Sequence, residues 1–206
     1  MATWTVEPYF ERRMREDDPD VNQGEQNDWG CLINFIDEEK SLWARAIVEF
    51  DLSAFPGESD GSDITSVTLD GWSLATQPAF GYDVDFRRCT QPALAVASEV
   101  TWNEYSTGNS WSTAGGSPTA TDKVTLASGS YGLLQQSYLG FETLTIDALV
   151  NRSNILSLIN RFTSEADDAF DRDFVLRSTT DPTGPAPILV ITYGVSVAVP
   201  IQVMTY

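Results

Sequence analysis

Three aromatic residues within the segment 98–116 have the chemistry needed to bind a sugar. Trp102 and Trp111 flank a Thr-Gly turn, and Tyr105 lies between them. The flat faces of such rings make apolar contacts with pyranose rings, so the three side chains form a candidate glycan platform. Aromatic rings also fill the cores of β-sandwiches, and alternation with Val100 places Trp102 on one face of a predicted strand. We expect core packing here and keep the glycan platform as the alternative.

Two groups of acidic side chains contain the oxygen ligands that Ca²⁺ prefers. Asp18, Asp20 and Asn22 alternate as in a calcium loop. The glycine of that loop comes one place late, at Gly24, and Trp29 stands where a bidentate Glu is required, so an Asx-rich turn is expected. Runs of charge are usually solvated, so we predict no metal and no cofactor. The calcium alternative rests on a second, denser group made up of Asp167, Asp168, Asp171 and Asp173.

The chain has no histidine, the residue used most often as a general base and as a ligand of transition metals. Its only cysteines, Cys31 and Cys89, are too few for a zinc cluster and too far apart for a CxxC motif. Two buried thiols are expected, with a single disulfide as the alternative. No nucleophile motif or phosphate-binding glycine loop is present, so we predict that the protein is not an enzyme.

The charge of the chain excludes further classes of partner. Lys and Arg number 12 against 30 Asp and Glu, which gives a formal net charge of −18. Phosphate polymers and anionic membrane surfaces are repelled by such a chain, so neither nucleic acid nor membrane is a predicted partner. The N-terminal segment has no apolar region behind basic residues, which predicts synthesis in the cytoplasm without a signal peptide.

The candidate residues lie on a chain whose pattern predicts an all-β fold. Turn signals recur about every ten residues between short β-rich segments, which favours an antiparallel β-sandwich or jelly roll in one domain. The clearest strand runs from Leu42 to Leu52, with even-numbered apolar residues on one face and Arg45, Ile47 and Glu49 on the other. This alternation predicts a half-buried strand with only the apolar face in the core. One short helix is predicted around Ile155, Leu158, Ile159 and Phe162, whose spacing is that of an apolar helical stripe. A short β-rich segment from Phe141 to Ile146 is predicted to be a strand.

Both ends of the chain are apolar and β-prone. We divide the sequence into an N-terminal arm (1–20), a jelly-roll domain (21–193) and a C-terminal tail (194–206) that contains Pro200. Uncovered strand edges promote association, so both ends are expected to dock on their own domain or on a neighbouring subunit. The residues predicted to bind a partner are Trp4, Val6, Val195, Val197, Val199, Ile201 and Val203.

Several motifs are similar to those of the DNRLRE-type domains, a family of β-jelly-roll modules related to carbohydrate-binding domains. The strand of residues 43–50 ends in F-D-L-S-x-F-P-G, and residues 98–116 contain W-N-x-Y-x-T-G-x-x-W. Further likeness lies in residues 64–69, 144–150 and 187–193, so that it covers most of the chain. The resemblance implies a jelly-roll fold and identifies Arg45 and Asp51 as scaffold residues. The family is commonly secreted with polysaccharide-active enzymes, whereas similar stand-alone domains occur among bacteriophage virion proteins.

This resemblance, with the absence of a signal and of catalytic motifs, predicts a non-enzymatic virion structural protein. We expect a bacteriophage capsid cement or decoration protein on the outer surface of the capsid, made in the host cytoplasm and anchored through its termini. Its predicted partners are the major capsid protein or other virion subunits, and a homo-oligomer is expected. A glycan-binding module of a phage appendage or of a secreted bacterial assembly is the alternative. A polysaccharide-active enzyme without the usual signature is the third hypothesis.

Overall fold

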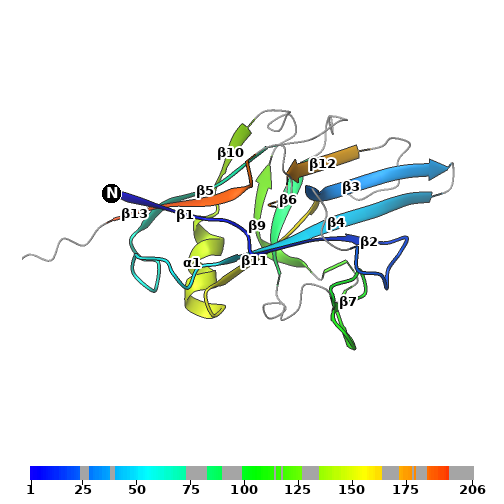
Figure 1. Cartoon of the computed structure of the whole chain (residues 1–206), viewed down its shortest axis with the longest axis horizontal. Coiled ribbons are helices and arrows are strands. Elements are labelled where there is room, and N and C mark those ends of the chain that lie inside the picture. The colour runs from blue at the N-terminus through cyan, green and yellow to red at the C-terminus, as the bar shows by residue number, and fades with distance from the viewer. Residues whose placement is uncertain are drawn as a thin grey trace, which may run out of the picture.

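Strands with one apolar face require a second layer to cover that face, and here two antiparallel sheets cover each other (Figure 1). The computed structural model describes residues 1–23, 28–37, 40–72, 83–89, 99–113, 115–116, 118–126, 135–163, 172–177, 179 and 185–194. The small sheet has four strands in the order β1-β13-β5-β10: β1 (Ala2–Val6), β13 (Ile188–Tyr193), β5 (Ile64–Trp72) and β10 (Gln135–Leu139). The all-β sandwich predicted from the sequence is confirmed.

The large sheet has seven strands and contains the longest strand of the protein. Its order is β12-β3-β4-β11-β6-β9, and β2 pairs with β4 beside this path. A separate two-stranded sheet is the hairpin of β7 (Glu104–Ser106) and β8 (Asn109–Ser110). The strands of the large sheet are β2 (Phe10–Arg15), β3 (Asp28–Asp37), β4 (Lys40–Asp51), β6 (Val84–Cys89), β9 (Pro118–Leu126), β11 (Ile155–Phe162) and β12 (Arg172–Arg177).

Strand β4 lies in the interior of the large sheet. Its residues 46–49 pair with β11 on one edge and with β2 on the other, both antiparallel. The predicted apolar face is confirmed, because Ala46, Val48 and Phe50 lie in the main core between the two sheets. The prediction that only one face is buried is wrong, since Arg45, Ile47 and Glu49 on the opposite face are buried as well.

A second core explains why this opposite face is buried. We call the side of the large sheet that is turned away from the small sheet its outer face, and residues 99–113, 115 and 116 the covering loop. Val100, Trp102 and Trp111 of the covering loop pack onto the outer face. Their partners on the sheet are Phe10, Met14, Ile47, Cys89 and Ile159.

Two glycines let the end of the covering loop approach the sheet. Gly115 and Gly116 have φ values of 76° and 99°, a region that other residues rarely adopt. A Cβ on Gly115 would lie 2.5 Å from Nη1 of Arg45, and a Cβ on Gly116 would overlap Ile159. The Gly-Gly pair is therefore a packing requirement of the second core.

The described residues form one helix, and it is not where the sequence pattern placed it. The predicted helix at Ile155–Phe162 is strand β11, and the predicted strand from residue 141 to residue 146 belongs to α1 (Glu142–Asn151). Ser153 and Asn154, which have φ values of 53° and 66°, form the turn from α1 into β11. The stripe in β11 is not helical because the strand is central and buried on both faces. Helix α1 contacts β5 and β11, one from each sheet, and so closes one end of the sandwich (Figure 1).

Two segments of the predicted N-terminal arm, Ala2–Val6 and Phe10–Arg15, are strands of the two sheets. Strand β1 pairs with β13 of the small sheet, and β2 pairs with β4 of the large sheet. Trp4 and Val6, predicted to contact a partner, pack against the main core of their own domain. The other predicted partner-binding residues, Val195, Val197, Val199, Ile201 and Val203, lie outside the described residues.

Candidate functional site

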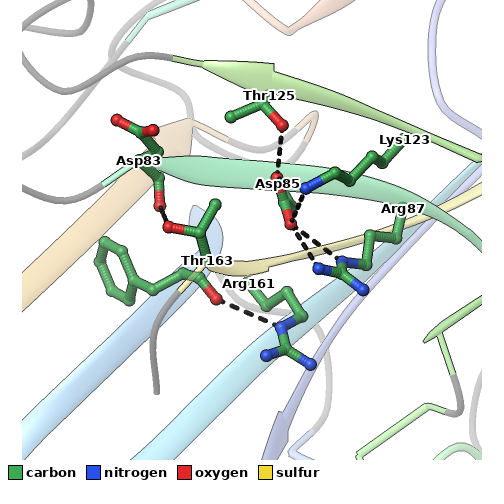
Figure 2. Close-up of polar contacts among 8 residues, drawn as sticks. Asp83, Asp85, Arg87, Lys123, Thr125, Arg161 and Thr163 are labelled. Carbon is green, nitrogen blue, oxygen red and sulfur yellow. Dashed lines mark hydrogen bonds and ion pairs between the residues drawn. The ribbon is translucent and has the colours of Figure 1, made fainter. Parts of the chain in front are cut away.

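The densest polar group on the outer face surrounds Asp85 of β6 (Figure 2). The strand register places Thr125 of β9 and Arg161 of β11 beside Asp85. The carboxylate accepts hydrogen bonds from Thr125 Oγ1 at 2.6 Å, from Arg87 Nη2 at 2.6 Å and from Arg87 Nε at 3.0 Å. Lys123 Nζ lies 3.2 Å and 3.1 Å from its two oxygens. One carboxylate thus organises side chains from adjacent strands.

Arg161 extends on the same side of the sheet as Arg87, but it has a different contact in Figure 2. Its Nε donates to the main-chain oxygen of Phe162 at 3.2 Å. The carboxylate of Asp83 points away from Asp85, and the main-chain oxygen of Asp83 accepts from N and Oγ1 of Thr163. The network that surrounds the Asp85 carboxylate therefore consists of Arg87, Lys123 and Thr125.

The protonation of Asp85 is set by these donors. Its side chain is 0% exposed, whereas those of Arg87 and Lys123 are 15% and 36% exposed. Burial by itself raises the pKa of Asp85, but the hydrogen bonds from Thr125, Arg87 and Lys123 outweigh burial and hold the pKa below its ordinary value. Asp85 is therefore a carboxylate at neutral pH. Its two oxygens already accept hydrogen bonds from four donor atoms, which are Thr125 Oγ1, Arg87 Nε, Arg87 Nη2 and Lys123 Nζ. This arrangement suits a structural anchor better than a proton acceptor or a cation ligand.

A second ion-pair group links α1 to the inner face of the large sheet. Arg88 Nη1 contacts Asp147 Oδ2 at 2.5 Å, and Arg152 Nε contacts the same oxygen at 3.4 Å. Burial opposes ionisation of Asp147, but hydrogen bonds from Asn151, Arg88 and Arg152 lower its pKa. This group fixes the helix that closes the end of the sandwich.

The aromatic residues of the candidate glycan platform belong to the second core. Trp102 and Trp111 are 6% and 5% exposed, and only Tyr105, which packs on Trp111, is partly exposed. The guanidinium of Arg45 lies 5.0 Å from the Trp102 ring centre, and its Nη1 donates to Gly115 O at 2.7 Å. The core interpretation of the two tryptophans therefore holds, and their faces are not open to a sugar.

A buried acid that the sequence did not single out lies on the same face. Glu49 is completely buried, and its Oε2 accepts a hydrogen bond from the hydroxyl of Tyr9 at 2.6 Å. Burial, followed by the hydrogen bond and the charge of Glu49, raises the pKa of Tyr9 well above its ordinary value. The hydroxyl therefore stays protonated and remains a donor, so this pair ties the start of β2 to β4.

Of the two acidic groups considered as calcium sites, the structure describes the side chains of the first group only. The turn at residues 18–22 docks on the covering loop, where Asn22 Nδ2 donates to Val100 O and Asn103 Nδ2 donates to Asp20 Oδ1. It is thus the polar turn expected from its residues. Asp167, Asp168 and Asp171 lie outside the described residues, and of Asp173 only the backbone is described, in β12. Within the described part of the chain, no three acidic or sulfur side chains gather as metal ligands.

The edge of the small sheet carries an aromatic group that sequence patterns did not reveal. Trp4 of β1 lies 5.6 Å from Phe55, and Phe55 lies 5.2 Å from Tyr193 of β13, measured between ring centres. Phe55 belongs to the F-P-G turn that follows β4. Only the fold brings these three segments together, because they are far apart in the sequence. The group packs the start of β1 firmly onto the sandwich.

Comparison with known proteins adds no function. The sequence matches no family model, and it matches none of the curated proteins. The likeness to DNRLRE-type domains therefore stays a prediction. The described residues contain no helix with the length and apolar character that crossing a membrane requires.

Proposed function

We propose that the protein is a non-enzymatic structural subunit of a bacteriophage particle, and more specifically a cement protein on the outer surface of the capsid. The observation that carries the proposal is the covering loop. It covers part of the outer face of the large sheet, where Trp102 and Trp111 pack in the second core and Arg45 of β4 lies against Trp102. Of the three aromatic residues of the predicted platform, the two tryptophans therefore pack in the interior, which favours sheet edges and chain ends as binding surfaces.

The polar groups support the same interpretation. Asp85 and Asp147 are each held by basic side chains that lower their pKa values. A general acid needs a raised pKa and a free face towards substrate. These carboxylates instead cross-link neighbouring elements, which suits a subunit that must withstand stress in a particle. The proposed partners are the major capsid protein or other virion subunits, with synthesis in the host cytoplasm.

Mass spectrometry of purified particles tests the proposal directly. The phage that encodes the chain should contain it at a copy number comparable with that of the major shell protein. Particles made without it should release their genome at a lower temperature, and added protein should restore the wild-type temperature. Absence from the particle, or a trace copy number, would exclude the cement role.

A glycan-binding role is the second candidate, because one aromatic residue of the predicted platform stays partly open. Tyr105 lies on the β7–β8 hairpin, whose residues 107–110 are exposed and polar. A glycan array with wild type, Tyr105→Ala and the control Tyr9→Phe tests this role. Binding that is lost only with Tyr105→Ala would favour it, whereas no binding by the wild type would reject it. Trp102→Ala is unsuitable here, because it disrupts the second core.

A further inference from the structure

Strand β1 is an outer strand of the small sheet, and its sequence contains no charged residue. Among the described residues, β1 pairs only with β13. Natural sheets discourage unwanted pairing with charged edge residues. Charged residues occur in each outer strand of the large sheet, whose sequences are FERRMR in β2, PTATDKVTL in β9 and RDFVLR in β12, whereas β1 has the sequence ATWTV. The free edge of β1 therefore has the character of a strand acceptor.

The segment that follows β13 has the length and pattern of the missing strand. Residues 195–199, VSVAV, are followed by Pro200, which has no N–H and ends regular pairing. This gives five residues, and β1 also has five. Their alternation matches that of β1, in which Ala2, Trp4 and Val6 are turned inward and Thr3 and Thr5 are exposed. An antiparallel register with Val197 opposite Trp4 places valines beside the inward residues.

The exit of the chain from β13 prevents this pairing within one molecule. Tyr193 lies between Ala2 of β1 and Ile64 of β5. The next residue, Gly194, donates its N–H to Asp63 O at 2.8 Å and is therefore held on the β5 side, away from β1. The free edge of β1 is two strand spacings from β13, about 10 Å. One residue spans at most about 3.6 Å, so Val195 cannot reach that edge in its own chain.

We propose that residues 195–199 of one copy add as an antiparallel strand to β1 of a second copy of this chain. In this register Val195 faces Val6, Val199 faces Ala2, and Ser196 faces Thr5. The acceptor is preformed, because Trp4 is packed against Phe55 and the main core. Each copy offers one strand and one edge, so two copies can exchange strands reciprocally. Repeated one-way addition gives a ring where the rotation between copies closes and an open filament where it does not. The inference does not depend on the role in a phage particle.

Cysteine cross-linking distinguishes exchange between copies from folding back. Copies carrying Thr5→Cys are mixed with copies carrying Ser196→Cys, refolded together and oxidised. The proposal requires a disulfide between the two copies on a non-reducing gel and by mass spectrometry. Gln202→Cys, beyond Pro200, replaces Ser196→Cys in the control and should give little cross-link. A double variant that forms the bond only within one chain would overturn the proposal.

The oligomeric state provides the second measurement, by sedimentation equilibrium of the full chain. Val197→Pro removes an N–H from the middle of the donated strand and should weaken association by about tenfold or more. Ile201→Pro, the same type of change beyond Pro200, should leave association unchanged. A monomeric wild type, or equal effects of the two prolines, would refute strand exchange. A monomer that is still abundant in particles would refute only strand exchange, whereas an oligomer absent from particles would refute only the cement role.

Discussion

The network around Asp85 allows a quantitative test of its structural role. Asp85→Asn keeps the shape of the side chain but removes the negative charge between Arg87 and Lys123. Removing one partner of a buried ion pair costs about 3–5 kcal/mol, because the other charge is left uncompensated. Lys123 is 36% exposed and can turn to solvent, but Arg87 is 15% exposed and cannot do so freely. We therefore expect the free energy of unfolding to fall by about 3 kcal/mol, at the lower end of that range.

Asp147→Asn is the matched control for this change. Asp147 also contacts two cations, but its side chain is 24% exposed, and that of Arg152 is 34% exposed. Solvent screens this pair, so the expected loss is about 1 kcal/mol. Urea unfolding followed by tryptophan fluorescence and circular dichroism gives both values. A loss below about 1 kcal/mol for Asp85→Asn, or a larger loss for Asp147→Asn, would refute the proposed order.

The pH dependence of Asp85→Asn follows from the sign of the pKa shift. The folded-state pKa of Asp85 is lowered, so its charge stabilises the fold above the ordinary aspartate pKa, near 4. That stability is lost as the pH falls through the folded-state pKa. The difference between wild type and Asp85→Asn should therefore be constant from about pH 5 to 8 and shrink below about pH 4. A difference that stays the same in acid would contradict the electrostatic explanation.

Three further changes test the second core and its surroundings by the same unfolding assay. Gly116→Ala adds a Cβ at φ 99° against the sheet and should cost about 2 kcal/mol or more. Gly140→Ala, with a φ of 98° and only an ordinary contact with Val124 at 3.8 Å, should cost about 1 kcal/mol. Trp102→Ala should cost about 3–5 kcal/mol, and a loss below about 1 kcal/mol would contradict core packing. Tyr9→Phe should cost about 1 kcal/mol and should leave the tyrosine absorbance change near pH 10 unaltered, because the raised pKa keeps Tyr9 protonated there.

The sandwich could be predicted because its strands obey local rules. The inner face of β4 alternates in sequence as it does in the structure, and turn residues mark most strand ends. The same rules failed at α1 and β11. Leu158 and Ile159 fit a helical stripe, yet both are buried in β11 because a central strand packs on both faces. Residues 142–151 look β-prone through Thr143, Thr145 and Ile146, but they form a helix that closes the sandwich.

The buried charges could not be predicted, because their partners come from distant parts of the chain. Arg45 meets Gly115, and Asp85 meets Lys123 and Thr125, across separations that periodicity does not describe. The sequence gives a net charge of −18, but it does not show where the 12 Lys and Arg side chains lie in the fold. Register places Arg45, Arg87, Lys123 and Arg161 on the outer face of the large sheet. Four of the 12 cations therefore lie together on this face.

The most specific part of the family likeness is the segment 98–116, and the structure gives its two tryptophans and Gly108 a structural reason. Trp102 lies against Arg45, and Trp111 Nε1 donates to Thr101 O at 3.0 Å. Gly108, with a φ of 76°, makes the tight turn between β7 and β8. These residues of the motif keep the covering loop packed on the outer face, so the motif indicates a fold and not a ligand. It therefore gives no independent support to a sugar site, and function is better sought at the edge of β1.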